Sequence, residues 1–140
     1  MEIVELIGVA AMRAAFPLIK QLRPYLDESR YLQLLAEMVP RGYRMFAVRD
    51  GEVLRAVAGI ELCVNLYHGR HVWVYDLVTD EHERSRGVGQ RLLRHIEELA
   101  RAQDCERVSL ASGLGRKDAH RFYQDRMHYD RASYLFTKKL

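Results

Sequence analysis

The spacing of hydrophobic residues changes period along the first 79 residues, and each change predicts a different element. Residues 10–22 and 27–38 place apolar side chains at helical spacing, with Pro17 inside the first stretch and Asp27 as the N-cap of the second. The β-forming runs that follow are separated by turn signals at residues 50–51 and 68–69, and they cover residues 43–49, 53–66 and 71–79. With a short edge strand at residues 1–7, the pattern predicts a strand, two helices and an antiparallel three-stranded meander.

The second half of the chain alternates helical and extended patterns. Residues 87–103 form an amphipathic helical pattern, and residues 107–112 read as a strand. A strand, a helix and a strand in this order imply a right-handed parallel crossover. A short helix at residues 118–124 and a last strand at residues 132–138 complete an α+β chain, which we expect to form one domain over residues 1–140.

Composition narrows the classes of partner. The chain is 49% hydrophobic and 29% charged, as in ordinary globular proteins, and its net charge is +3. Nucleic acid is an unlikely partner, because the basic residues are spread out and not interleaved with aromatic ones. Cys63 and Cys105 show no metal-ligand spacing, and no apolar run is long enough for a membrane span. We expect a cytoplasmic protein without a metal site or a membrane segment.

One stretch, residues 74–96, carries the strongest chemical signal. An apolar strand pattern is followed by a charged loop, and then by the sequence Arg84-Ser85-Arg86-Gly87-Val88-Gly89-Gln90 at the start of a helix. Backbone N–H groups from Ser85 to Gln90 would converge on an anion, and the glycines would let it approach closely. The stretch predicts a site for a phosphorylated cofactor, against the alternative of a glycine-eased turn with solvated arginines.

Two motifs in this half resemble a known family. Arg84-x-x-Gly87-x-Gly89 resembles the acetyl-CoA signature of the GNAT superfamily of N-acetyltransferases, and Ala119-x-x-Phe122-Tyr123 resembles a second segment of that family. The resemblance implies a mixed, mostly antiparallel twisted sheet with a V-shaped splay between strands 4 and 5, flanked by about four helices. It also implies acetyl-CoA as acyl donor, with these binding residues: Leu77, Val78, Thr79, Arg84, Ser85, Arg86, Gly87, Val88, Gly89, Gln90 and Arg116.

The same resemblance implies direct acetyl transfer to a primary amine, with Tyr123 as general acid near the sulfur. A phenol pKa of about 10 suits protonation of a thiolate whose thiol has a pKa of about 8.5. Many relatives carry a glutamate where this chain has Tyr75. Asp76, Glu61 and Glu81 of the loop remain as candidates for the base, with a water relay through Asp76 or Glu61. Asp76 is equally suited to a structural hydrogen bond, whereas for Glu61 a place on a solvated strand face is favoured over the role of base.

Two other functions stay open from sequence alone. They are a non-catalytic acyl-CoA binding or sensor domain and a basic nucleic-acid module. For the enzyme, we expect the acceptor to be a small-molecule or peptide amine, neutral or anionic in the rest of its structure. A homodimer mediated by the last strand, around Tyr134–Phe136, is an alternative to a monomer.

Overall fold

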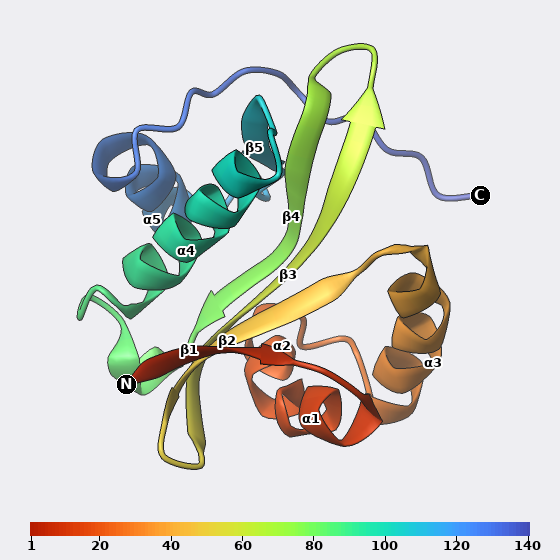
Figure 1. Cartoon of the computed structure of the whole chain (residues 1–140), viewed down its shortest axis with the longest axis vertical. Helices are drawn as coiled ribbons and strands as arrows, with labels where there is room; N and C mark the ends of the chain where they lie inside the picture. The colour runs from red at the N-terminus through yellow and green to blue at the C-terminus, as the bar shows by residue number, and fades with distance from the viewer. The chain divides into compact units, whose positions relative to one another are not determined.

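A five-stranded sheet in the order β1-β2-β3-β4-β5 organises the first part of the chain (Figure 1). The computed structural model describes all residues 1–140 and divides into two compact units, residues 1–109 and 110–140. Neighbouring strands are antiparallel from β1 to β4, and β5 is parallel to β4. The strands are β1 (Glu2–Leu6), β2 (Arg44–Asp50), β3 (Val53–Asn65), β4 (Gly69–Thr79) and β5 (Arg107–Leu110). The mixed sheet and the predicted edge strand are therefore confirmed.

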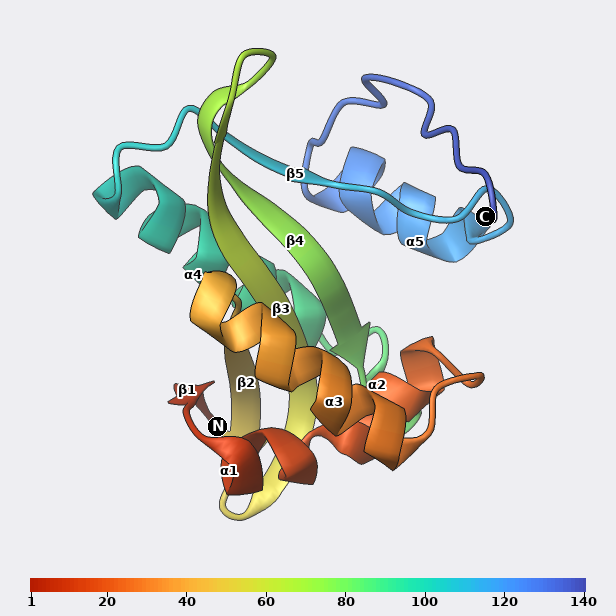
Figure 2. The ribbon, with the colours of Figure 1, turned by 90° about the vertical axis from the view of Figure 1, so that its right-hand side faces the viewer.

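Helices cover both faces of this sheet, as Figure 2 shows. One face packs against α1 (Val9–Ala14), α2 (Phe16–Leu22) and α3 (Glu28–Met38), and the other against α4 (Val88–Ala102). The N-cap prediction at Asp27 is confirmed, since its side chain accepts a hydrogen bond of 2.7 Å from the Arg30 N–H. The short turn η1 (Val39–Arg41) follows α3.

The first predicted helix is divided in two. Ala15 ends α1, and Pro17 lies in the first turn of α2, where a missing N–H costs no hydrogen bond. The chain therefore has five α-helices where the sequence predicted about four.

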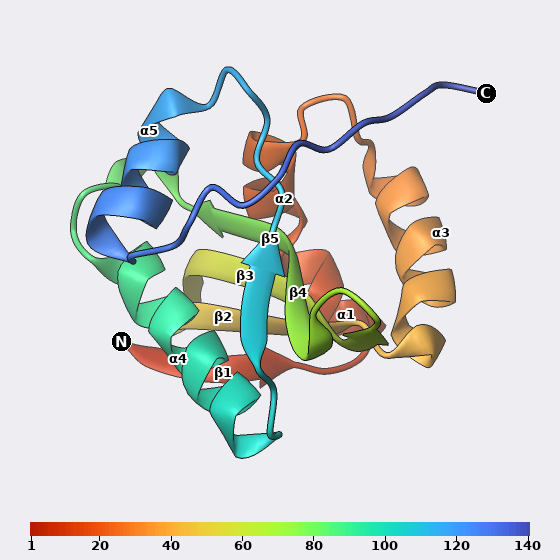
Figure 3. The same cartoon turned by 90° about the horizontal axis from the view of Figure 1, so that it is seen from above.

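The core lies on both faces of the central strands. Leu92, Leu93 and Ile96 of α4 are fully buried, as are Ile60 and Val72 of the sheet. Figure 3, viewed from above, shows α4 lying along one face of the sheet. The hydrophobic period of residues 87–103 thus identified the buried face of α4 correctly.

A β-bulge interrupts the pairing of β3 with β4. Gly59 pairs with Asp76 and Ile60 pairs with Val74, so Tyr75 is the extra residue on β4. A Cβ atom on Gly59 would overlap the hydroxyl of Tyr43. Gly59 therefore lies at the bulge and leaves room for the Tyr43 side chain to approach the backbone closely.

The unit of residues 110–140 contains α5 (Lys117–Arg121), followed by one turn of π-helix, η3 (Phe122–Arg126). The prediction of a strand at residues 132–138 is wrong, because this segment has no regular structure. A strand needs a neighbour that satisfies its backbone groups, and none of the five strands of the sheet pairs with it. Its apolar side chains Tyr134, Leu135 and Phe136 are exposed. The homodimer expected at this strand stays a prediction.

Candidate active site

The loop between β4 and α4 turns through two left-handed residues. Asp80 caps the short helix η2 (Glu81–Glu83) by accepting a hydrogen bond of 2.9 Å from the His82 N–H. Ser85 then has φ 68° and Gly87 has φ 78°. These conformations bring the chain sharply into the first turn of α4.

The start of α4 offers unpaired backbone donors. Its first intrahelical bond runs from the Arg91 N–H to the Gly87 carbonyl, at 3.0 Å. The N–H groups of Val88, Gly89 and Gln90 therefore have no acceptor within the helix, and no side chain caps them. The first turn carries no acidic residue, so the helix dipole and these donors favour an anion. The open space beside Gly87 leaves room for one.

A buried carboxylate lies beneath this loop. Glu83 is 6% exposed, and it forms ion pairs with Arg55 of β3 at 3.3 Å and with Arg86 at 3.6 Å. Sequence reasoning missed Glu83 and treated it as part of a solvated charged loop. Its i,i+3 spacing from Arg86 is the only trace of this contact in the sequence.

The far edge of β4 is open where the resemblance predicts a donor contact. Leu77, Val78 and Thr79 pair with β3 on one edge. On the other edge, the Glu106 N–H donates to the Arg70 carbonyl at 2.7 Å just before β5 begins. A parallel strand of four residues starting there ends about opposite Val74. No strand of the sheet therefore pairs with residues 77–79 on that edge, and the Val78 side chain is buried.

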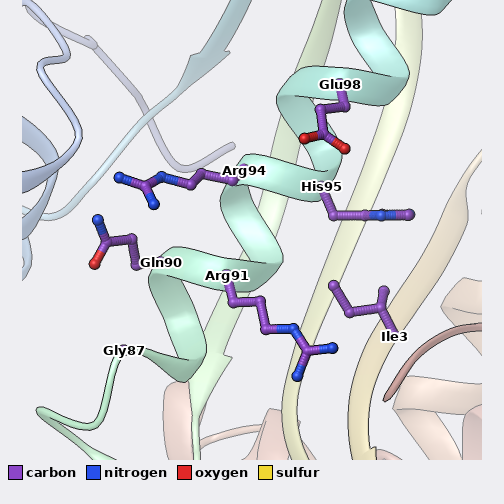
Figure 4. Close-up of a pocket in the computed structure, with 7 residues that line it drawn as sticks. All are labelled: Ile3, Gly87, Gln90, Arg91, Arg94, His95 and Glu98. Carbon is purple, nitrogen blue, oxygen red and sulfur yellow. The ribbon is translucent and has the colours of Figure 1, made fainter. Parts of the chain in front are cut away.

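A basic cavity adjoins the start of α4. It has a volume of about 350 Å³, and Figure 4 shows it along the helix, with Arg91 and His95 on the side of Ile3 and with Arg94 projecting away. Gly87 and Gln90 also line it, so the cavity is continuous with the helix start. Arg91 and Arg94 outweigh Glu98, the one carboxylate that lines the cavity, so its lining has a net positive charge.

Asp76 is held by two donors. It is 9% exposed and accepts hydrogen bonds from the Tyr43 hydroxyl at 2.7 Å and from Arg23 Nε at 2.9 Å. Arg23 also donates to the Tyr75 carbonyl at 2.7 Å, which fixes the bulge. Burial, together with the nearby Asp76 charge, raises the pKa of Tyr43 well above its usual value. The geometry of Asp76 is that of a structural acceptor.

Glu61 lies beside the bulge and is only partly buried. Its carboxylate accepts hydrogen bonds from the Tyr75 hydroxyl at 2.9 Å and from Cys63 Sγ at 3.2 Å. Burial and the Glu61 contact raise the pKa of Tyr75 to about 12 and that of Cys63 to about 11. Both groups stay protonated near neutral pH, so Cys63 is a poor nucleophile.

The second unit holds Tyr123 and Arg116. Tyr123 lies in the turn η3 and is 9% exposed, with its ring against those of Phe122 and Tyr129. Burial raises the pKa of Tyr123, while the charge and a hydrogen bond of Arg116 act in the opposite direction. The phenol is therefore protonated at neutral pH, as a general acid must be. Arg116 forms a hydrogen bond with Tyr123 in this unit. Its predicted contact with the acyl donor stays a prediction.

No helix of the chain is long and apolar enough to cross a membrane.

Comparisons with known proteins identify the family of this chain. The sequence pattern of the acetyltransferase (GNAT) family matches residues 9–129. The chain is 42% identical over 125 residues to the uncharacterised N-acetyltransferase YhdJ of Bacillus subtilis, covering 89% of this chain and 88% of that protein. It is 32% identical over 102 residues to the aminoalkylphosphonate N-acetyltransferase of Salmonella typhimurium, covering 72% of this chain and 65% of the relative.

A solved structure has the same fold. The aminoglycoside N-acetyltransferase AAC(6′)-Iy in complex with CoA superposes with a TM-score of 0.82 at 15% identity, over 99% of this chain and 93% of that one. At this identity the likeness concerns the fold, whereas the match over residues 9–129 and the two sequence relatives concern ancestry. The chain therefore belongs to the GNAT family of acetyltransferases.

Proposed function

We propose that this acetyltransferase moves an acetyl group from acetyl-CoA directly to a primary amine of a small molecule or peptide. The observation that carries the proposal is the start of α4, where three uncapped N–H groups follow a left-handed Gly87 and the first turn contains no acidic residue. A diphosphate is the anion that such a site suits best. A structural neighbour was solved with CoA, which supports the same donor here.

The chain's own groups suggest how the donor is held. The N–H groups from Ser85 to Gln90 bind the diphosphate, and the free edge of β4 at residues 77–79 pairs with the amides of the pantetheine arm. A backbone N–H on that edge donates to the thioester carbonyl and stabilises the charge that develops on its oxygen.

Proton transfers complete the reaction. The amine nitrogen forms a bond to the thioester carbon, and the carbon–sulfur bond breaks. Tyr123 gives its proton to the departing sulfur, and the proton lost by the amine passes through water to Glu61. We assign the base to Glu61 and not to Asp76, because Asp76 is buried and both of its oxygens already accept hydrogen bonds.

The acceptor is proposed at the level of chemical class. One relative is named for aminoalkylphosphonates, and one structural neighbour for aminoglycosides. Both classes present a primary amine on a small polar molecule. We therefore place small primary amines, including those with an anionic group, ahead of larger acceptors.

A sensor domain that binds acyl-CoA without turnover is the second candidate. One observation favours it: Asp76, the acid of β4, is fully engaged in structural contacts. The partly buried Glu61 and the protonated Tyr123 favour the enzyme.

Thiol release from acetyl-CoA separates these two candidates. The protein is incubated with acetyl-CoA and a panel of amines that includes 2-aminoethylphosphonate, an aminoglycoside, amino acids and a short peptide. Mass spectrometry identifies any acetylated product. The enzyme proposal predicts amine-dependent release with at least one acceptor, whereas CoA binding with no turnover on the whole panel supports the sensor.

A further inference from the structure

The ion pair between the half-buried Arg55 and the buried Glu83 has no part in the proposed transfer step. Glu83 is 6% exposed, and its Oε2 atom has no hydrogen-bond partner. The Nε atom of Arg55 is likewise buried without a partner. Removing charged groups from water is costly, and at 3.3 Å this contact is a loose ion pair. Such a pair adds little to the stability of the fold, which points to a role in holding the neighbouring loop in place.

Arg55 anchors the loop after β4 at two points. Its carbonyl accepts a hydrogen bond of 2.8 Å from the Asp80 N–H, and its guanidinium meets the Glu83 carboxylate. Asp80 and Glu83 are the residues at the two ends of the loop's first turn, and the Glu83 N–H also donates to the Asp80 carbonyl at 2.8 Å. Arg55 therefore holds both ends of the turn, while the Gln21 side chain of α2 accepts a hydrogen bond of 3.0 Å from the Glu81 N–H in its middle.

The chain beyond this anchor is strained. Ser85, a residue with a side chain, has φ 68°, which costs about 1–2 kcal/mol compared with ordinary backbone. Such a conformation persists only when surrounding contacts enforce it. Glu83 lies two residues before Ser85, and its second ion pair reaches Arg86 on the far side. The ion pair between Glu83 and Arg86 therefore connects the residues on the two sides of Ser85.

The held segment leads directly to the proposed phosphate site. Glu83, Arg86 and Gly87 line one small cavity of about 190 Å³ together with Val88 and Arg91. Glu83 is buried on the inner side of the loop, whereas the Arg86 side chain is 69% exposed. The acidic group therefore supports the loop from below and leaves the arginine accessible to an anion.

We propose that Glu83 and Arg55 are positioning residues that hold residues 80–87 in the shape that binds the phosphates of the acyl donor. The inference rests on the proposed function, since it assumes that this loop binds the donor. It assigns the pair to the phosphate-bearing end of the donor and gives it no part in the transfer step.

Two donors that differ only in their phosphates test this assignment. Steady-state kinetics compare acetyl-CoA with S-acetylpantetheine, which has the thioester and pantetheine arm but no phosphate. Glu83→Gln should raise the KM for acetyl-CoA about tenfold and leave kcat within about twofold, because it removes binding that is equal in ground and transition states. Its kcat/KM for S-acetylpantetheine should stay within about twofold of wild type.

Glu81→Gln is the matched control. Glu81 lies in the same turn and its side chain is 60% exposed, so the variant removes the same charge without breaking the buried pair. For this variant, kcat/KM should stay within about twofold of wild type with either donor, because exposed charges are screened. Arg55→Lys keeps the charge but loses the guanidinium, so it should raise the KM for acetyl-CoA by less than Glu83→Gln does. It also carries the test if Glu83→Gln does not fold.

Calorimetric titration with CoA and with pantetheine separates the two proposals. Wild-type protein that does not bind CoA contradicts the proposed function. Wild-type protein that binds CoA, with Glu83→Gln binding it equally well, contradicts the positioning role alone. If Glu83→Gln lowered kcat/KM equally for acetyl-CoA and for S-acetylpantetheine, the pair would only stabilise the fold. That result would also overturn the inference.

Discussion

At the scale of single residues, two carboxylates beside the bulge have different surroundings. Asp76 is buried between Tyr43 and Arg23, whereas Glu61 is only partly buried and contacts Tyr75. The sequence offered both as bases and could not separate them. Their environments depend on the bulge at Tyr75 and on an arginine 53 positions earlier in the chain, and neither is encoded in the local pattern.

Asp76→Asn should therefore destabilise the fold more than it impairs the chemistry. The change leaves Arg23 with a buried partner that has lost its charge, and we expect a loss of about 2–3 kcal/mol in the free energy of unfolding. Urea denaturation measures this loss. Glu61→Gln is the contrasting variant: kcat should fall about tenfold or more, with stability nearly unchanged. A reversed pattern would assign the base to Asp76.

Buried phenols predict how stability depends on pH. The pKa of Tyr43 is raised by burial and by Asp76, so the folded protein holds this proton more tightly than the unfolded chain does. Protonated Tyr43 should therefore contribute fully to the stability of the fold below the usual phenol pKa of about 10. This contribution should be lost as the pH rises from there towards the pKa that Tyr43 has in the folded protein. One such group contributes up to about 1.4 kcal/mol per pH unit above pH 10.

Tyr43→Phe isolates that contribution. Urea denaturation between pH 9 and 11 should show a shallower decline for this variant than for wild type. Tyr67→Phe removes an exposed phenol and should keep the wild-type slope. An identical slope in all three proteins would mean that Tyr43 does not titrate differently in the folded state.

At the scale of elements, the hydrophobic pattern predicted most of the fold because burial on one face imposes a period. The meander, α3 with its cap at Asp27 and the buried face of α4 followed from local sequence. The strand at residues 132–138 did not form, since a strand exists only where another strand accepts its hydrogen bonds. Three adjacent apolar residues, Tyr134 to Phe136, indicate β-propensity but say nothing about a partner.

Alanine substitutions at two glycines distinguish the cost of backbone strain from the cost of steric overlap. Gly87 has a left-handed φ of 78° but open space around it, so Gly87→Ala should cost only the backbone strain of about 1–2 kcal/mol. Gly59→Ala would drive a Cβ atom into Tyr43 and Asp76, and it should cost more, about 3 kcal/mol. Thermal or urea denaturation of the two variants measures both costs. Equal losses would show that β3 and Tyr43 move apart freely.

At the scale of the whole molecule, the residues of the proposed reaction come from two units. The loop proposed to bind the diphosphate, residues 77–79 of β4 and Glu61 belong to residues 1–109, while Tyr123 and Arg116 belong to residues 110–140. The motifs around Gly87 and Tyr123 were readable in the sequence because backbone geometry and a phenol at fixed spacing define them. The Arg55–Glu83 pair was not, because nothing local distinguishes a buried glutamate from a solvated one in a charged loop.

The most direct test of the central claim is the turnover number of Tyr123→Phe, measured with acetyl-CoA and the best acceptor of the amine panel. Direct transfer with Tyr123 as general acid predicts that kcat falls about a hundredfold, while the Kd for CoA measured by calorimetry stays within about twofold of wild type. An unchanged kcat would contradict the assignment of Tyr123. Tight CoA binding by the wild-type protein, without turnover on any amine, would contradict the transferase itself.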